Sequence, residues 1–499
     1  MQTILTVEAM RESDAAAIAG GVAGAELMKR AGRAIFGAAS WAPPVAVVCG
    51  KGNNGGDGYA LALNLAEAGI SCTIFAQAAP VTPEAAGFEQ ACRKHGIPMM
   101  PWTEMSDLRG FHTVADCIFG TGFRGEAAGE AARVIRLINA SGARVISADI
   151  NSGLNGDNGL GDPAVISSLT VSIGCPKPGH FLGRAKDVMR GTVNADIGIP
   201  PRGHMLRRLE EKDAAAMLPP RIRFSNKGTY GTAALIGGSL PYSGAVRLAA
   251  MGNAAMRSGA GIARVAAPAG LCPLVAASVL ECTLFPLPER EGHMTYCRES
   301  LLEAVKGTRT AVFGMGAGNT EDTQRAVQCL LQEYPGILVL DADGLNALAA
   351  LGTEWLRHAA GRVILTPHPG EFGRLTGRSA AEVLKDPVGL AESFARDTGA
   401  VVLLKGAATV ITDGKETFLT DTGCAGMATA GSGDVLSGVL GALCAWRRES
   451  LTETTALAAW VNGRAGEIAQ ARMGDISMTA GDTVKALPEV FVRLRNQAL

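Results

Sequence analysis

The stretch VAVVCGKGNNGGDG, residues 45–58, joins a short apolar run to a glycine-rich loop. The run 45–49 has the length and composition of a buried strand, and residues 58–68 have the apolar spacing of a helix. The loop carries the spacing G-x-G-x-x-G between a strand and a helix, where a dinucleotide-binding fingerprint stands. A strand, loop and helix in this order are typical of an α/β domain with parallel strands.

The alternation of strands and helices extends in both directions from this stretch. Before it, residues 6–20 and 24–39 have helical apolar spacing. After it, the sequence predicts strands at 71–76, 114–119, 144–149 and 168–173, with helix-compatible segments among them. This pattern predicts a mostly parallel sheet covered by helices on both faces, in a Rossmann-like three-layer αβα domain.

The side chains of the loop differ from those of a dinucleotide fingerprint. Residues 71–77 have no acid near their end to hold a ribose hydroxyl, which disfavours an NAD-dependent oxidoreductase, and no G-K-[ST] ends the loop. Asn53, Asn54 and Asp57 instead supply oxygens that suit a monovalent cation or the polar rim of a ligand. A tight turn capped by Asn and Asp is the better interpretation of a lone G-x-G-x-x-G, whereas the whole string GKGNNGGDG favours binding.

Two further polar segments end neighbouring strands. Asp116 precedes residues 117–125, which read CIFGTGFRG, and Asp149 ends a strand and begins DINSG. A single aspartate at such a place is more often a helix cap than a catalyst. Ligands of open α/β sheets bind at the carboxyl ends of the strands, so three such segments at consecutive strand ends predict one binding crevice.

Together the motifs GNNGGDG, D-x-I-F-G-T-G and D-x-x-S-G-L resemble those of the N-terminal epimerase domain of the bifunctional NAD(P)H-hydrate repair enzymes. The resemblance covers about residues 1–205. It implies that the hydrated nicotinamide nucleotide contacts Asn53, Asn54, Gly55, Gly56, Asp57, Gly120, Thr121, Gly122, Phe123, Arg124, Gly125 and Glu126. It also implies that Asn54, Asp116 and Ser152 bind a potassium ion and that Asp149 touches the reacting ring as acid/base. Asn151 is a departure, because the family usually has proline there.

Residues 196–225 interrupt the pattern with two Pro-Pro pairs and a charged run, as at a domain junction. We therefore expect one domain at 1–205 and a second, larger α/β domain at 206–499. Its strands are expected at 233–236, 263–266, 310–313, 337–340, 363–365, 401–404, 409–412 and 417–419. Two long helices, near 431–446 and 452–471, are expected to close it.

The most informative string of the second half is Gly431-Ser432-Gly433-Asp434, directly before a helix. Small residues at a helix N-terminus present free N–H groups and a positive dipole end to an anion. An aspartate there can take the proton of a substrate hydroxyl during phosphoryl transfer. The alternative is that the glycines only allow close packing and Asp434 caps the helix. Gly314-Met315-Gly316-Ala317-Gly318 is a second candidate for phosphate binding.

This G-x-G-D loop resembles the anion hole of ribokinase-like kinases. With Gly237–Ser239, Arg257–Gly261, Asp341–Asn346 and Thr366–Glu371 the chain resembles the ADP/ATP-dependent NAD(P)H-hydrate dehydratases over about residues 206–495. The resemblance implies substrate contacts by Ala245, Gly318, His368 and the catalytic Asp434. It implies contacts to the nucleotide, with a magnesium ion, by Lys405, Gly406, Ala407, Ala408, Thr409, Gly431 and Gly433.

The two resemblances together imply a repair enzyme. It would interconvert R- and S-NAD(P)HX, the hydrated forms of NADH and NADPH, and dehydrate the S form at the expense of ADP or ATP. The alternative is a ribokinase-like small-molecule kinase with a non-catalytic N-terminal binding domain. Intact Asn54, Asp57, Asp116 and Asp149 argue against a mere binding module.

Composition and charge set the remaining expectations. A net charge of −1 provides no overall field for nucleic acid or an anionic membrane. The 11 cysteines are scattered and lack C-x-x-C spacing, which disfavours disulfides and cysteine-rich zinc sites and favours a reducing compartment. Neither a signal-peptide core nor a membrane-spanning run is present, so we expect a cytoplasmic protein. A homo-oligomer is left open.

Overall fold

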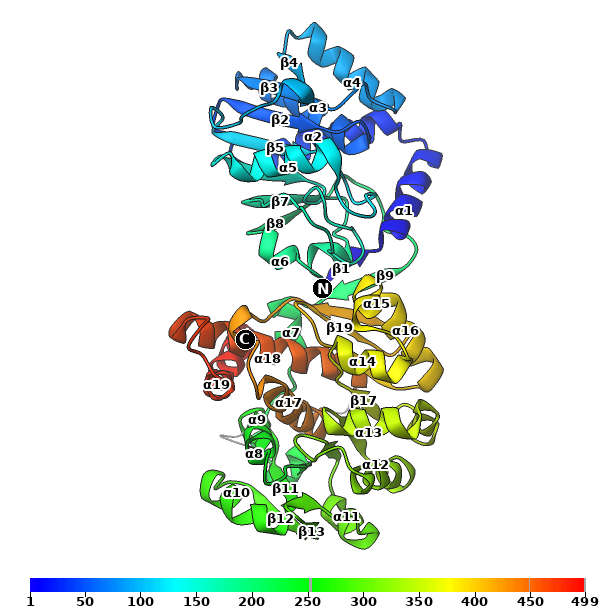
Figure 1. Ribbon diagram of the computed structural model, residues 1–499, viewed down its shortest axis with the longest axis vertical. Coiled ribbons are helices and arrows are strands. Elements are labelled where there is room, and N and C mark those ends of the chain that lie inside the picture. The colour runs from blue at the N-terminus through cyan, green and yellow to red at the C-terminus, as the bar shows by residue number, and fades with distance from the viewer. Residues whose placement is uncertain (251–253, 448, 498–499) are drawn as a thin grey trace. The chain divides into compact units, whose positions relative to one another are not determined.

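The computed structural model describes residues 1–250, 254–447 and 449–497. They form two compact units, one of Thr3–Leu206 and one of Met1–Gln2 with Arg207–Leu499 (Figure 1). No described helix is at once long enough and apolar enough to cross a membrane. All eleven cysteines lie in the described residues and are free thiols.

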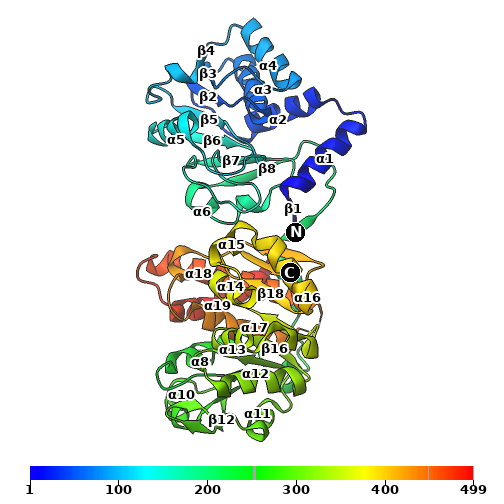
Figure 2. The same ribbon diagram turned by 45° about the vertical axis from the view of Figure 1, so that its right-hand side comes forward.

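The sheet of the first unit is parallel throughout, and its strands lie in the order β4-β3-β2-β5-β6-β7-β8 (Figure 2). The bounds are β2 Val45–Cys49, β3 Cys72–Ala76, β4 Met99–Pro101, β5 Thr113–Cys117, β6 Arg144–Ala148, β7 Leu169–Ile173 and β8 Thr192–Ala195. From β2 the chain builds outward to β3 and β4 and then returns to build β5 on the other side. Ligands of open α/β sheets bind at such a reversal of strand order.

Helices cover both faces of this sheet. They are α1 Val7–Ala19, α2 Gly24–Ala38, α3 Asn53–Glu67, α4 Pro83–Lys94, α5 Gly129–Ala140 and α6 Ala185–Val188, with β1 Gln2–Leu5 before them and short 3₁₀ turns at η1 Trp102–Glu104 and η2 Pro178–His180. Alternate side chains of β2 enter different apolar clusters, with residues of α2 and α3 on one face and of α5 on the other. This three-layer arrangement confirms the predicted fold class.

The first turn of α3 corrects an expectation. The helix expected from residue 58 begins at Asn53, because close packing holds a turn that has no apolar residues of its own. A Cβ on Gly56 would lie 2.5 Å from Met28 of α2, and one on Gly55 would lie 1.9 Å from the carbonyl oxygen of Gly50. The second half of the glycine loop is therefore the helix N-terminus itself.

In the second unit the strands lie in the order β9-β20-β19-β18-β17-β16-β15-β10-β11-β12, antiparallel only at β18–β19 and β19–β20. Their bounds are β9 Met205–Arg208, β10 Thr232–Ile236, β11 Ile262–Pro268, β12 Thr283–Leu287, β15 Thr310–Phe313, β16 Ile337–Leu340, β17 Val363–Leu365, β18 Val401–Leu404, β19 Thr409–Thr412 and β20 Thr417–Thr420, beside a short hairpin of β13 Glu289–Arg290 and β14 His293–Met294.

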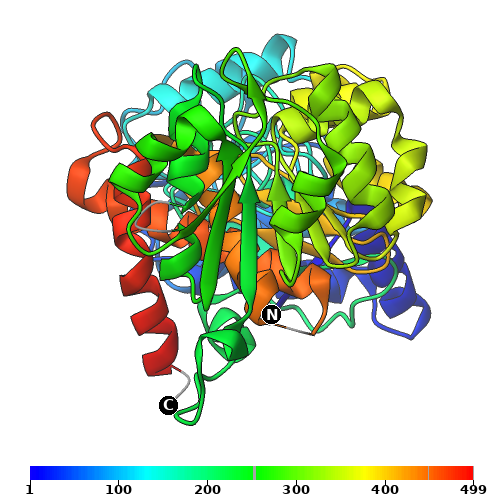
Figure 3. The ribbon, with the colours of Figure 1, turned by 90° about the horizontal axis from the view of Figure 1, so that it is seen from below.

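Helices flank these strands on both sides (Figure 3). They are α7 Glu211–Met217, α8 Ser243–Ala250, α9 Ala254–Arg257, α10 Cys272–Ser278, α11 Arg298–Val305, α12 Glu321–Glu333, α13 Asp343–Leu351, α14 Pro369–Thr376, α15 Ala380–Lys385, α16 Pro387–Thr398, α17 Ser432–Trp446, α18 Leu451–Met473 and α19 Ala480–Gln497, with 3₁₀ turns at η3 Lys227–Tyr230, η5 Ala269–Leu271, η6 Thr353–Ala359 and η7 Ala425–Met427. Residues Val435–Ala445 of α17 are all buried, so this helix forms the centre of the core.

Candidate active sites

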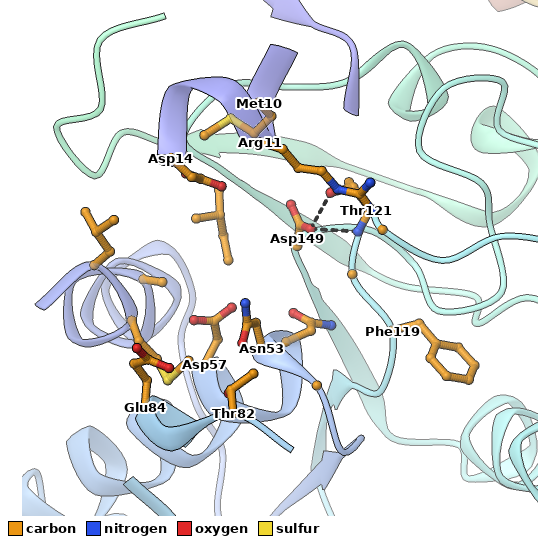
Figure 4. Close-up of a pocket in the computed structure, with 18 of the residues that line it drawn as sticks. Met10, Arg11, Asp14, Asn53, Asp57, Thr82, Glu84, Phe119, Thr121 and Asp149 are labelled. Atoms are coloured by element: carbon orange, nitrogen blue, oxygen red, sulfur yellow. Dashed lines mark hydrogen bonds between the residues drawn. The ribbon is translucent and has the colours of Figure 1, made fainter. Parts of the chain in front are cut away.

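A pocket of about 700 Å³ opens at the carboxyl ends of β2, β5 and β6 (Figure 4). Its walls come from α1 and α2, from the glycine loop, from the loop after β5 and from the segment after β7. Of the residues expected to bind the nucleotide, it is lined by Asn53, Asn54, Asp57, Gly120, Thr121, Gly122, Phe123 and Asp149. The wall residues in the described part of the chain do not include Gly55, Gly56, Arg124, Gly125 or Glu126.

Asn54 has a buried side-chain amide without a hydrogen-bond partner in the part of the chain that the structure describes. Its side chain is only 7% exposed, yet neither its oxygen nor its nitrogen has a hydrogen-bond partner. Buried polar atoms are nearly always paired in folded proteins, because leaving one unpaired costs about 1–3 kcal/mol. The Asn54 amide is therefore placed to meet a bound ion or molecule.

Asp149 is held tightly at the carboxyl end of β6. Its Oδ1 lies 2.8 Å from Lys177 Nζ, and its Oδ2 accepts hydrogen bonds from the amide and hydroxyl of Thr121 at 2.8 and 2.9 Å. Its φ of 62° is in the left-handed region, which a non-glycine residue adopts only under constraint. Burial would raise the pKa of Asp149, but Lys177 and the Thr121 amide outweigh burial and hold that pKa below its ordinary value.

His180 links Asp149 and Lys177 through their backbones. Its Nε2 donates to the backbone oxygen of Asp149 at 2.6 Å, and its Nδ1 accepts from the backbone amide of Lys177 at 3.1 Å. Burial and the neighbouring Lys177 charge lower the pKa of His180 to about 4, so the ring is neutral. Lys177 and His180 belong to none of the sequence motifs; the signal that the sequence offers for them is the string K-P-G-H shortly after β7.

Asp116 and Ser152 lie beneath the loop after β5. Asp116 is fully buried and accepts from Ser152 Oγ at 2.5 Å, from Ser147 Oγ at 2.8 Å and from the Ser152 amide at 2.9 Å. Burial raises its pKa in spite of these bonds, and no basic side chain in the described residues pairs with it. A buried carboxylate without a counter-charge, together with the unpaired Asn54 oxygen, fits a monovalent cation.

Asn151, the residue at which the sequence departs from the resemblance, has a fully bonded buried side chain. Its Nδ2 donates to the carbonyl oxygens of Val165 and Val188 at 2.8 and 3.1 Å, and its Oδ1 accepts from Thr170 Oγ1 at 2.5 Å. Ser167 Oγ joins the same network. The side chain thus fixes the segment between Asp149 and Ser152 to the strand and loop beside it.

The second candidate site surrounds the N-terminus of α17. Gly431 precedes the helix with a φ of 92°, and Asp434 lies in its first turn. A Cβ on Gly433 would lie 3.7 Å from both Asp341 Oδ2 and Lys405 Nζ, so this ion pair lies directly beside the glycine turn. Burial and the Asp341 charge raise the pKa of Asp434 to about 7, against the effect of Lys405.

Asp341 lies beside the first turns of α17 and pairs with Lys405. Its buried carboxylate accepts from Thr366 Oγ1 and Ser437 Oγ at 2.8 Å each and from Lys405 Nζ at 3.1 Å. Burial would raise its pKa, but Lys405 and the two hydroxyls keep that pKa low. Two neighbouring carboxyls with pKa values moved apart are typical of acid–base sites.

The remaining predicted residues lie on loops of the same unit. His368 is 53% exposed on its side chain and caps α14, where its Nδ1 accepts from the amides of Gly370 and Glu371. Gly318 donates its amide to Asp343 at 2.8 Å, and a Cβ on Gly316 in the same loop would lie 2.9 Å from that of Ala245. The turn between β18 and β19 holds Gly406, Ala407 and Ala408, and Thr409 begins β19. Lys405 Nζ is also 3.8 Å from Glu371.

Comparisons with known proteins match both units. The family model described as "NAD(P)H-hydrate dehydratase" matches residues 233–489, and that described as "YjeF-related protein N-terminus" matches residues 24–179. The bifunctional NAD(P)H-hydrate repair enzyme of Moorella thermoacetica is 36% identical over 91% of this chain and 88% of its own. That of Escherichia coli is 34% identical over 93% and 89%.

One solved structure supports the fold of the second unit. A ribokinase-like superfamily protein from Enterococcus faecalis has a TM-score of 0.50 and 22% identity, and the match covers 58% of this chain and 97% of that one. The second unit therefore has a ribokinase-like fold, as the G-x-G-D loop predicts.

Proposed function

The chain belongs to the family of bifunctional NAD(P)H-hydrate repair enzymes, and from this premise we propose how its two units divide the reaction. It is an enzyme of nicotinamide-nucleotide repair with an epimerase and a dehydratase domain. We assign interconversion of R- and S-NAD(P)HX to residues 1–205 and dehydration of S-NAD(P)HX to residues 206–499.

In the first unit the hydrated nicotinamide ring would occupy the pocket beside Asp149. Its nucleotide would contact the glycine turn from Asn53 to Asp57 and the loop from Gly120 to Glu126. Potassium would be held by Asn54, Asp116 and Ser152, which is supported by the unpaired amide of Asn54 and the uncompensated charge of Asp116. A bound cation there would supply positive charge beneath the substrate loops.

In the second unit Asp434 would act as base toward the C6 hydroxyl of the substrate. Burial raises the pKa of Asp434 to about 7, and a pKa near the operating pH suits a general base that must both take up and release a proton. The amides of Gly431–Gly433 would hold the migrating phosphoryl group, and the segment from Lys405 to Thr409 would contact ADP or ATP. Magnesium, bound with the nucleotide, would neutralise phosphate charge.

Dehydration proceeds as a phosphoryl transfer followed by an elimination. Asp434 removes the hydroxyl proton, and the oxygen attacks the terminal phosphorus, releasing AMP from ADP or ADP from ATP. The ring nitrogen then expels phosphate as the C6–O bond breaks, and loss of a ring proton restores the dihydronicotinamide. Phosphorylation is needed because hydroxide is a poor leaving group.

The observation that carries this proposal is that one chain matches both parts of known repair enzymes over nearly its full length. It is supported by Asp149 in the pocket of the first unit and by Asp434 in the first turn of α17 in the second. The test is recovery of dihydronicotinamide absorbance from hydrated NADH with potassium, magnesium and either ADP or ATP. We expect nucleotide-dependent recovery by the wild type and none by Asp434→Asn. Accumulation of a phosphorylated alcohol with no recovered dinucleotide would contradict the proposal in favour of a small-molecule kinase.

A further inference from the structure

Asp14 of α1 is a pocket residue that none of the sequence motifs includes. It lines the pocket together with Asp57 and Asp149, and the three carboxylates come from α1, from α3 and from the end of β6 (Figure 4). Asp14 is half-buried and has no hydrogen bond or ion pair in the described residues. Its carboxyl group is therefore free to meet a ligand.

The other two carboxylates are placed differently. Both oxygens of Asp149 are occupied by Lys177 and Thr121. Asp57 has no hydrogen-bond partner among the described residues, and it lies in the first turns of α3, within the glycine-rich motif. Asp14 thus combines a free carboxyl with a place in the pocket wall on α1, a helix outside the glycine loop.

The surroundings of the pocket raise the pKa of two of its carboxyl groups, Asp14 and Asp57. Lys177 is the buried cation, and it is committed to Asp149, whereas Arg11 and Lys51 are exposed at the rim. The titratable and charged wall residues are Arg11, Asp14, Lys51, Asp57, Glu84, Asp149 and Lys177. Burial and the Asp149 charge raise the pKa of Asp14 to about 6, although Lys177 opposes them. Burial, Asp149 and Asp14 raise the pKa of Asp57 well above its ordinary value.

We propose that Asp14 is a second catalytic residue of the epimerisation, giving a proton to the departing C6 hydroxyl while Asp149 takes one from the incoming water. This inference rests on the proposed function of the first unit. It divides the reaction between an acid on α1 and a base at the end of β6, whereas the sequence motifs alone would place both roles on Asp149.

Epimerisation by these two residues needs no reactant other than water. The Asp14 proton moves to the C6 oxygen, the C6–O bond breaks to release water, and the ring-nitrogen lone pair forms a C6–N double bond. A water molecule then adds to the opposite face of C6 and gives a proton to Asp149, and the nitrogen regains its lone pair. One turnover inverts C6 and moves one proton from Asp14 to Asp149, which exchange with solvent resets.

Asp14 is better suited to this role than Asp57. A proton donor works best when its pKa lies near the operating pH, because it must give up its proton and regain it in each cycle. The pKa of Asp14, about 6, meets this condition, whereas burial together with Asp149 and Asp14 raises the pKa of Asp57 well above its ordinary value. Asp57 in its protonated form is suited to donating a hydrogen bond to the substrate.

The experiment uses the full-length protein with R-enriched hydrated NADH, ADP, magnesium and potassium. The dehydratase unit removes the S form, so recovery of the R form measures epimerisation, and recovery from S-enriched substrate is the internal control. We expect Asp14→Asn to slow R recovery about 100-fold, as loss of a general acid does, and to leave S recovery unchanged. Asp14→Glu should restore part of the rate. Glu12→Gln, an exposed acid of the same helix outside the pocket wall, is the matched control.

The pH profile separates a proton donor from a structural residue. In the wild type, R recovery should fall at high pH as Asp14 loses its proton, and Asp14→Asn should lack this decline. An Asp14→Asn enzyme within threefold of the wild type, or one that keeps the decline, would overturn the proposal. So would disappearance of the decline in Asp57→Asn alone. If the wild type recovers neither form, the proposed function itself fails; if it recovers both, only the role of Asp14 is in question.

Discussion

Lys177 Nζ lies 2.8 Å from Oδ1 of Asp149, and only 2% of the lysine side chain is exposed. A buried cation of this kind stabilises the ionised form of its partner. Removing it leaves an uncompensated buried charge, which commonly costs 3–5 kcal/mol, about half the stability of a typical domain.

The first prediction therefore concerns Lys177→Met. The pKa of Asp149 should rise, since Lys177 is the main influence that lowers it. If Asp149 must be ionised to act as base, the acidic limb of the R-recovery profile should move to higher pH by about one unit or more. The profile is measured with S recovery as reference. An unchanged acidic limb in a folded variant would contradict the assigned role of Asp149.

The same pair predicts how stability depends on pH. The folded-state pKa of Asp149 is depressed, so its contribution is fully present above its ordinary value of 3.8 and is lost as pH falls through the folded value. Wild-type stability should therefore fall steeply below about pH 4, and that of Lys177→Met much less. Chemical denaturation at pH 3–7 checks this, and parallel curves for the two proteins would refute it.

His180→Leu tests the backbone link. The substitution leaves the Asp149 carbonyl and the Lys177 amide without their partner, which costs about 1–3 kcal/mol for each buried group. We expect slower R recovery, unchanged S recovery and a lower melting temperature of the first unit. His95→Leu, at the exposed C-cap of α4, is the matched control. Equal melting temperatures for the two variants would show that the hydrogen bonds of His180 do not stabilise the first unit.

Asn151→Pro is expected to destabilise the first unit. The substitution removes a side chain that bonds Val165, Ser167, Thr170 and Val188, so several buried polar atoms lose a partner. We expect a loss of about 2–4 kcal/mol in unfolding free energy, similar to that of Asn151→Ala. A proline variant as stable as the wild type would mean that the network is replaceable.

In the second unit, S recovery should depend on the ionisation of Asp434. Because its pKa is raised to about 7, kcat/KM should fall about tenfold for each pH unit below 7. Asp341→Asn removes a negative neighbour and frees Lys405, and both changes should move this inflection to lower pH. An inflection that stays in place or moves up would contradict the coupling of the two carboxyls.

The motif residues were predictable because each motif is short and ends a strand. The glycine turn, the loop after β5 and Asp149 meet at one edge of the sheet as a consequence of parallel strand order. Lys177 was not predictable in the same way, since it reaches Asp149 from 28 residues away through the segment after β7. Asp14 lies on a helix that precedes the sheet altogether.

In the second unit, too, contacts between residues far apart in the sequence could not be predicted. Asp341 belongs to the motif Asp341–Asn346, but its hydrogen bond with Ser437 joins residues 96 positions apart. The sequence predicts two closing helices, whereas the structure has a third, α19, which contains Pro488. A proline usually marks a helix boundary, so the local pattern concealed this helix.

The most direct test of the central claim, that two separate sites act in turn on one substrate, is complementation between inactive variants. Asp149→Asn should recover only the S fraction of an R/S mixture, within a time shorter than spontaneous epimerisation, and Asp434→Asn should recover none. Mixing the two variants should restore full recovery, because each supplies the site that the other lacks. A mixture that stops at the S fraction would contradict the claim.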